Sequence, residues 1–199
     1  EPHGGMRAMF TMMNAARLAV GMQGLGIAAT AYQSAATYAK DRRQGRSLAK
    51  GARTDGEIGG DKSTGSDGPA DSILVHPDVR RMLATGRAEV FAARAIGLAC
   101  AQALDLATAT SDPECTARAA FLTPIAKSYG TDVGCRVADM GVQVHGGMGF
   151  IEETGAAQYY RDAKILTIYE GTTAIQANDL VGRKTARDGG KNAKDIAAQ

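Results

Sequence analysis

The chain has 199 residues, of which 44% are hydrophobic and 22% charged, and these proportions predict a soluble globular protein built as one domain. The net charge of +2, the absence of tryptophan and the lack of a long basic run argue against nucleic-acid binding as the main function. No apolar run approaches the roughly 18 residues of a membrane span, so no membrane span is expected.

The three cysteines, Cys100, Cys115 and Cys135, are odd in number and form no CxxC pair. This spacing favours reduced thiols over a disulfide framework, and it indicates a cytoplasmic protein, or one of the mitochondrial matrix if the source is eukaryotic. The histidines are scattered along the chain, so no metal site is expected.

The first predicted element is a helix over about residues 6 to 43. Its apolar residues form two stripes, one of which repeats at alternating spacings of four and three. A helix that is apolar on two sides packs on more than one side, as in a bundle. The basic run "KDRRQGR" suits a helix C-terminus. The stripes are Leu18, Met22, Leu25, Ala29, Tyr32 and Ala36, and Met13, Val20, Ile27, Ala31 and Tyr38.

The next segment, residues 51 to 71, is polar, rich in glycine and without periodicity, which predicts a loop. Its "GGDKST" run is similar to a phosphate-binding loop, but Asp61 stands where that loop needs a glycine before the lysine. The linker interpretation is therefore preferred.

The second helix is predicted to begin at Pro77, because the missing N–H of proline costs nothing at the first helical position. Small residues at Gly86, Ala93 and Gly97 would let a partner helix approach closely. A short segment follows "SDP". Thr123 and Pro124 are then expected to be the cap and the first residue of a third long helix.

The third helix is expected to stop at the glycines of "HGGMGF", and shorter helices are predicted over about 154–163 and 172–183. Strand signals are almost absent. The predicted fold class is all-α: an antiparallel, up-and-down four-helix bundle with short accessory helices.

Two segments could carry chemistry. The glycines after Gln143 form either a helix stop with a tight turn or a place where backbone amides and the Gln143 side chain contact a phosphate or a ring edge. Glu170, in "ILTIYEGTTAIQ", is either an acid that favours the dipole of the following helix or a general base shielded by Ile168 and Tyr169. Gly171 would let a ligand come close.

Together these segments show a resemblance. The stretch "QVHGGMGFIEETGAAQYYRDAKILTIYEGTTAIQ" closely resembles the C-terminal segment of the acyl-CoA dehydrogenase family. "MNAARLAVGMQGLGIAATAYQSAATYAKDRRQGR" and "HPDVRRMLATGRAEVFAARA" are similar to the first two helices of that family's C-terminal domain. The resemblance covers nearly the whole chain.

The resemblance implies FAD-dependent oxidation of an acyl-CoA to the trans-2-enoyl-CoA in fatty acid β-oxidation. It also implies electron-transfer flavoprotein as the acceptor and a homo-oligomer, either dimer or tetramer. Glu170 matches the base that removes the α-proton, while its backbone N–H and a flavin ribityl hydroxyl bind the thioester carbonyl. The alternatives are an acyl-CoA oxidase, and a non-catalytic helical oligomerisation module, which would need neither Glu170 nor the glycine segment.

The resemblance also assigns binding residues. Arg42 matches an arginine that reaches the FAD pyrophosphate of a neighbouring subunit, and the segment from Gln143 to Gly147 matches one that contacts the adenosine half of that FAD. The residues matched to FAD contacts are Arg42, Gln44, His76, Gln143, Gly146, Gly147 and Thr172. Those matched to acyl-CoA contacts are Asn14, Arg17, Tyr169 and Gly171.

Some positions depart from the family pattern. Gly45 stands where phenylalanine is common, Gln158 where many members have lysine or arginine, and Ala174 where some have glutamine. Ala16 occupies the alternative base position on the first helix and cannot serve as a base. The family's N-terminal helical and middle β-domains are not in this sequence, so residues 1–199 are expected to form the C-terminal domain alone.

Overall fold

The computed structural model describes residues 3–47 and 70–198, so most of the predicted 51–71 loop, with its "GGDKST" run, lies outside the described residues. The described elements are, in chain order, α1 (Gly5–Asp41), η1 (Ile73–Val75), α2 (Pro77–Thr110), α3 (Pro113–His145), α4 (Gly147–Phe150), η2 (Glu152–Thr154), α5 (Ala156–Leu166), α6 (Thr173–Asn178), η3 (Asp179–Thr185), η4 (Ala186–Asp188) and α7 (Lys191–Ala197).

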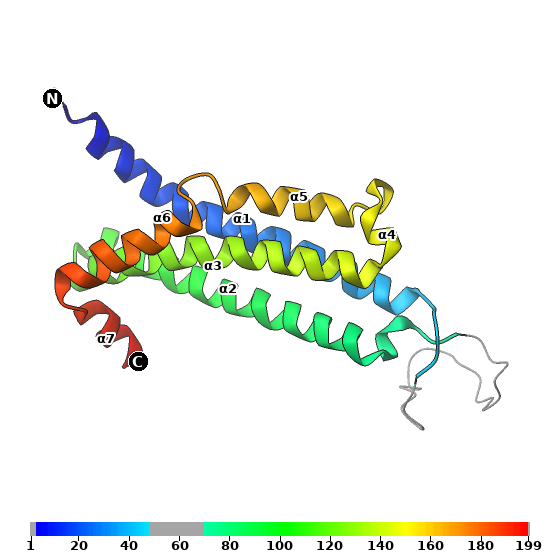
Figure 1. Ribbon diagram of the computed structural model, residues 1–199. Helices are drawn as coiled ribbons and strands as arrows, with labels where there is room; N and C mark the ends of the chain where they lie inside the picture. Colours follow the sequence, from blue (N-terminus) through cyan, green and yellow to red (C-terminus); the bar gives the residue numbers. More distant parts are fainter. Residues whose placement is uncertain (1–2, 48–69, 199) are drawn as a thin grey trace.

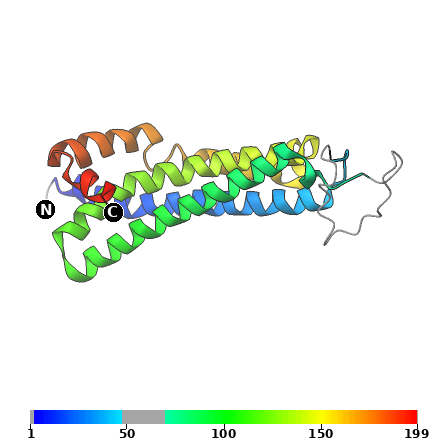
Figure 2. The same cartoon turned by 90° about the horizontal axis from the view of Figure 1, so that it is seen from below.

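Three long helices, α1, α2 and α3, lie side by side with alternating direction (Figure 1). Two shorter segments share the fourth position of the bundle along α3. Helix α5 runs back along one half of α3 and also contacts α1, while α6 and η3 cover the other half. Both termini lie at the end of the bundle opposite the α1–α2 connection (Figure 2). The prediction of an antiparallel helical bundle with short accessory helices is confirmed.

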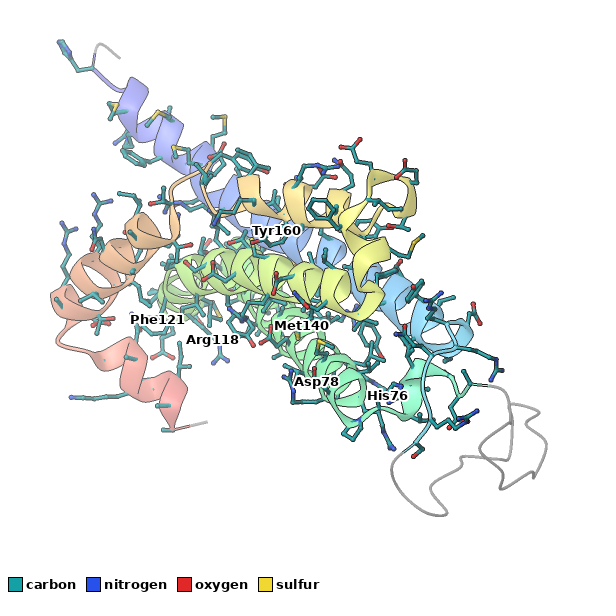
Figure 3. The ribbon with its side chains drawn as sticks, turned by 45° about the vertical axis from the view of Figure 1, so that its right-hand side comes forward. His76, Asp78, Arg118, Phe121, Met140 and Tyr160 are labelled. Atoms are coloured by element: carbon teal, nitrogen blue, oxygen red, sulfur yellow. The ribbon has the colours of Figure 1, made fainter. Side chains whose placement is uncertain are left out.

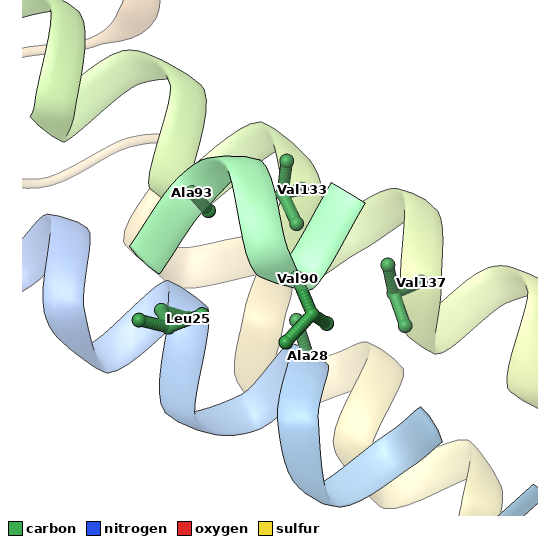
Figure 4. Packing of buried hydrophobic residues seen from close by; sticks show 6 residues of the cluster. All are labelled: Leu25, Ala28, Val90, Ala93, Val133 and Val137. Carbon is green, nitrogen blue, oxygen red and sulfur yellow. The ribbon is translucent and has the colours of Figure 1, made fainter. Parts of the chain in front are cut away.

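The middle of the core lies between α1, α2 and α3. It contains Leu25 and Ala28 from α1, Val90 and Ala93 from α2, and Val133 and Val137 from α3 (Figure 4). Both Ala28 and Val133 are completely buried. These side chains are small or branched, which lets the three helices pack at short range.

The shortest approach in this core joins the backbones of α1 and α3. A Cβ placed on Gly21 would lie 2.5 Å from the carbonyl oxygen of Ala126, and one on Gly24 would lie 2.4 Å from that of Gly130. The sequence pointed instead to the glycines of the second helix. Side chains of neighbouring helices pack against Gly86, and Gly97 leaves room for the sulfur of Met22. Neither glycine therefore brings two helix backbones into contact.

The expected start of the third helix was wrong. Helix α3 begins at Pro113, where the Asp112 side chain accepts a hydrogen bond of 2.9 Å from the Glu114 N–H. Pro124 lies inside the helix and is buried, and the Thr123 hydroxyl donates to the Ala119 carbonyl (2.8 Å) instead of capping. A long helix packed on several sides tolerates an internal proline that would break an isolated one.

The hydropathy of α2 departs from the expectation that no segment is apolar enough to span a membrane. An 18-residue window of α2 has a mean hydropathy of 1.5, so this helix is long and apolar enough to cross a membrane by length and composition. One such helix is weak evidence for a membrane span, and 28% of that window is buried inside the described structure. Here α2 packs against α1 and α3.

Candidate functional site

One cavity of about 620 Å³ lies at the end of the bundle where α1 stops and α2 starts. Tyr38 and His145 stack in its lining, with ring centroids 4.4 Å apart. His76 lies at this end of the molecule (Figure 3). The cavity brings together most of the residues matched to FAD contacts: Arg42, Gln44, His76, Gly146 and Gly147.

A short antiparallel pairing holds the Arg42–Gly45 segment in place. The Ile73 N–H donates to the Arg42 carbonyl (2.9 Å), and the backbone of Gln44 and Gly45 pairs with Asp71 at 3.0 and 2.9 Å. These hydrogen bonds hold the residues that follow α1 in an extended conformation. They fix the backbone from which Arg42 and Gln44 extend, while the two side chains stay exposed.

His76 explains the departure at Gly45. Its Nε2–H donates to the Gln44 carbonyl over 2.7 Å, and a Cβ on Gly45 would lie 3.2 Å from the His76 ring. Gly45 also has a φ of +71°, a conformation that a phenylalanine would rarely adopt. The imidazole of His76 therefore lies where the first atoms of a larger side chain at position 45 would be.

The opposite wall of the cavity is the end of α3. Gly146 stops the helix with a φ of +60°, and a Cβ on Gly146 or Gly147 would meet nothing within 4 Å. Gln143, one turn earlier, is exposed. A guanidinium, side-chain amides and open glycine backbone around an aromatic stacked pair are groups that could hold the pyrophosphate and adenosine half of FAD.

Glu170 lies elsewhere, in the turn between α5 and α6. Its φ is +55°, and its side chain is half-buried. Thr172 is the N-cap of α6, since its hydroxyl accepts from the Ile175 N–H (3.3 Å). Glu170 therefore precedes the cap and is outside the first turn, where an acid best favours the helix dipole.

The two polar groups of Glu170 that a substrate could use are unengaged. Among the described residues, none donates a hydrogen bond to the Glu170 carboxylate and none accepts one from its backbone N–H. Tyr169, on the same turn, donates its hydroxyl proton to Gln23 of α1. Gly171 has a φ of +88°. At this turn Glu170 thus presents both its side-chain carboxylate and its backbone N–H.

The Glu170 turn and the large cavity are separate places. Lys127 of α3 contacts the turn, whereas Val144 of α3 lines the cavity. The 17 residues between them correspond to roughly 26 Å along a helix. One subunit therefore does not bring both groups of expected residues to a single site. The expectation that the cavity serves a neighbouring subunit stays a prediction.

Asn14 and Arg17 lie in a third place, beside a cavity of about 280 Å³ between α1, α2, α3 and η3. The Arg17 guanidinium is only 5% exposed and pairs with Asp179 at 3.0 Å and with the Asn14 side-chain oxygen at 3.1 Å. Its Nε is buried without a partner among the described residues. The expected contact of Arg17 with acyl-CoA stays a prediction.

Sequence reasoning missed three buried polar residues near these sites: Lys127, Gln176 and Asp179. For Lys127 a signal exists. It shares a helical face with Gly130, Thr131 and Gly134, at spacings of three, four and seven, and a lysine among such small residues is a candidate for burial against a neighbouring helix.

The described residues offer few groups that could bind a metal ion or act as a reactive thiol. No cluster of three or more His, Cys, Asp or Glu side chains that could hold a metal ion occurs within residues 3–47 and 70–198. The three cysteines are free thiols. Burial raises the pKa of the Cys100 thiol, so this thiol is a poor nucleophile at neutral pH.

Comparison with known families gives one match over most of the chain. Residues 67–184 match the family model described as acyl-CoA dehydrogenase, C-terminal domain. The solved butyryl-CoA dehydrogenase of Megasphaera elsdenii has the same fold, with a TM-score of 0.70 and 27% identity over 92% of this chain and 39% of that one.

Curated relatives extend over the whole chain. It is 50% identical to the 3-methylmercaptopropionyl-CoA dehydrogenase of Ruegeria pomeroyi, over 99% of this chain and 32% of that protein. It is 35% identical to the broad-specificity linear acyl-CoA dehydrogenase FadE5 of Mycobacterium tuberculosis, over 100% of this chain and 31% of that protein. The chain thus spans about a third of the length of these relatives.

Proposed function

This chain belongs to the acyl-CoA dehydrogenase family, and we propose that it is the C-terminal domain of an FAD-dependent enzyme that oxidises an acyl-CoA thioester to the trans-2-enoyl-CoA. The observation that carries the proposal is the Glu170 turn. It presents a carboxylate and a backbone N–H with no protein partner among the described residues. Those are the groups needed to remove an α-proton and to bind the thioester carbonyl.

The α-carbon of a thioester is a far weaker acid than a carboxylic acid, so Glu170 needs help. Its backbone N–H donates a hydrogen bond to the carbonyl oxygen, where negative charge develops as the α-proton leaves. The substrate, when bound, excludes water from the half-buried carboxylate. FAD, when bound, would supply the acceptor for the hydride of the β-carbon, and electron-transfer flavoprotein is the proposed acceptor of its electrons.

The experiment uses the full-length protein that contains this chain, loaded with FAD. Anaerobic addition of acyl-CoA should bleach the flavin absorbance and yield the enoyl-CoA. The relatives' names make 3-methylmercaptopropionyl-CoA, butyryl-CoA and longer linear acyl-CoAs the substrates to compare. Turnover with electron-transfer flavoprotein supports a dehydrogenase, and hydrogen peroxide formed in air supports the oxidase alternative. A flavin that no acyl-CoA bleaches would favour the non-catalytic module.

The large cavity leads to a prediction about Arg42. Arg42→Ala in the full-length protein should weaken FAD retention, because a guanidinium that neutralises a pyrophosphate is lost. The flavin-to-protein absorbance ratio after dialysis measures this, and gel filtration shows whether the assembly persists. Arg43→Ala is the matched control, since Arg43 is also exposed and adjacent. Full flavin content in Arg42→Ala would exclude the role.

The outer surface predicts association. Large apolar side chains are exposed on α2, where Phe91 is 71% and Leu98 61% exposed, and at the start of α1, where Met6 is 63% exposed. Such surface is normally covered by another subunit. We therefore expect the 199-residue chain, produced alone, to be helical, oligomeric, colourless and without dehydrogenase activity. Light scattering, circular dichroism and an absorbance scan test this, and a stable monomer or a bound yellow flavin would contradict it.

A further inference from the structure

The Glu170 turn has a backbone that needs support. Glu170 and Gly171 both have left-handed φ values, +55° and +88°. For glutamate this conformation is disfavoured by contacts of its Cβ, so it persists only where surrounding contacts determine it. The loop that carries it, residues 167–171, joins two short helices, and neither helix by itself fixes its shape.

Lys127 of α3 supplies one set of contacts. Its side chain is completely buried, and its ammonium donates to the carbonyl of Leu166 (2.9 Å) and to that of Gly171 (2.7 Å). Leu166 is the last residue of α5, and Gly171 directly follows Glu170. One ammonium therefore joins the two ends of the loop and sets the distance between them.

Gln176 of α6 supplies the second set. It is 1% exposed, and its amide nitrogen donates to the carbonyls of Glu170 and Gly171, each at 3.2 Å. A Cβ on Gly171 would lie 2.7 Å from that nitrogen, so a larger residue at position 171 would displace the Gln176 amide. Together the two buried side chains bind the carbonyls of Leu166, Glu170 and Gly171.

The surroundings of Lys127 influence the protonation of its amine in opposite directions. Burial lowers the pKa of the Lys127 amine, the nearby carboxylates of Asp132 and Glu170 act in the opposite direction, and Arg17 acts with burial. The two carbonyl acceptors also favour the ammonium form, because a neutral amine donates more weakly. The proposed mechanism gives Lys127 no contact with substrate or with FAD.

We propose that Lys127 is a positioning residue for Glu170: by joining the carbonyls of Leu166 and Gly171 it holds the turn in the conformation that presents the carboxylate and backbone N–H to the thioester. The inference rests on the proposed function of Glu170. Its structural part, the dependence of the turn on Lys127, holds whatever reaction the protein performs.

The first test compares Lys127→Met with Lys164→Met in the FAD-loaded full-length protein. Methionine keeps much of the buried volume and removes both hydrogen bonds, whereas Lys164 is exposed on α5. We expect Lys127→Met to lower kcat about 10- to 100-fold, the scale of a misplaced catalytic group, with normal flavin content. The KM should stay within about twofold, because substrate binding itself is kept.

A second readout separates positioning from general destabilisation. Hydrogen exchange of the peptide that covers residues 167–171 should accelerate in Lys127→Met, while peptides from the middle of α1 and of α2 exchange as in the wild type. This measurement does not depend on activity. If acyl-CoA never reduces the wild-type flavin but the turn opens selectively, the proposed reaction fails and the structural part of the inference stands.

Chemical rescue gives the sharpest test. Lys127→Ala removes the equivalent of one n-propylamine molecule, so added n-propylammonium should restore kcat by about tenfold, while neutral 1-propanol should not. If neither Lys127 variant folds, Gln176→Met decides, with a fall in kcat at unchanged KM as the expected result. A kcat within about twofold of wild type in Lys127→Met, or a loss that neither exchange nor rescue localises to the turn, would overturn the inference.

Discussion

Glu170→Gln in the full-length enzyme is expected to lower turnover at least about 100-fold, the usual scale for removing a general base, while the flavin stays bound. Glutamine keeps the shape of the side chain and the backbone N–H but has no basic lone pair at neutral pH. Residues outside the base should therefore bind substrate and FAD as before. Stopped-flow bleaching of the flavin by acyl-CoA, under anaerobic conditions, measures the step directly.

The matched control is Glu153→Gln, an exposed glutamate in η2 that lies away from the α5–α6 turn. It makes the same chemical change with the same change in net charge, so it should leave the rate unchanged. Near wild-type flavin reduction in Glu170→Gln would show that another group removes the proton. Loss of flavin from that variant would show instead that Glu170 has a role in the fold.

Gly24→Ala should strongly destabilise the contact between α1 and α3. Its Cβ would lie 2.4 Å from the Gly130 carbonyl oxygen and 2.8 Å from the Thr131 Cα, and both are backbone atoms of α3 that cannot turn aside. Forcing the helices apart should cost about 2–3 kcal/mol of folding free energy, beyond the small gain in helix propensity. For an unfolding unit of about 200 residues this corresponds to a fall in melting temperature of about 5–10 °C, and we expect a smaller fall where the whole protein unfolds together.

Gly26→Ala makes the same change two residues further along α1. A Cβ on Gly26 would meet nothing within 4 Å, so only the helix propensity changes, and the melting temperature should rise by an amount that corresponds to about 0.5–1 kcal/mol. Thermal unfolding of both variants of the full-length protein tests the pair. If Gly24→Ala stabilises as Gly26→Ala does, α1 and α3 are not in backbone contact at Gly24.

The local signals in the sequence were read correctly where one helix determines them. The start of α2 at Pro77, the stop of α3 at Gly146 and the place of Glu170 between two short helices follow from proline, glycine and capping chemistry within a few residues. The start of α3 was missed because two pairs, Asp112–Pro113 and Thr123–Pro124, both have the pattern of a helix cap followed by proline. Only packing shows that Pro124 is inside the helix, where it is buried.

The sequence by itself determined that this protein is a helical bundle and singled out Glu170 and the glycine segment after Gln143 as candidate site residues, because periodicity and motifs are local properties. The tertiary structure alone decided that Arg17 pairs with Asp179, 162 residues away, and that Lys127 joins the two ends of the Glu170 turn. A buried polar group takes whichever partner the fold brings to it, and no spacing along the chain encodes that partner.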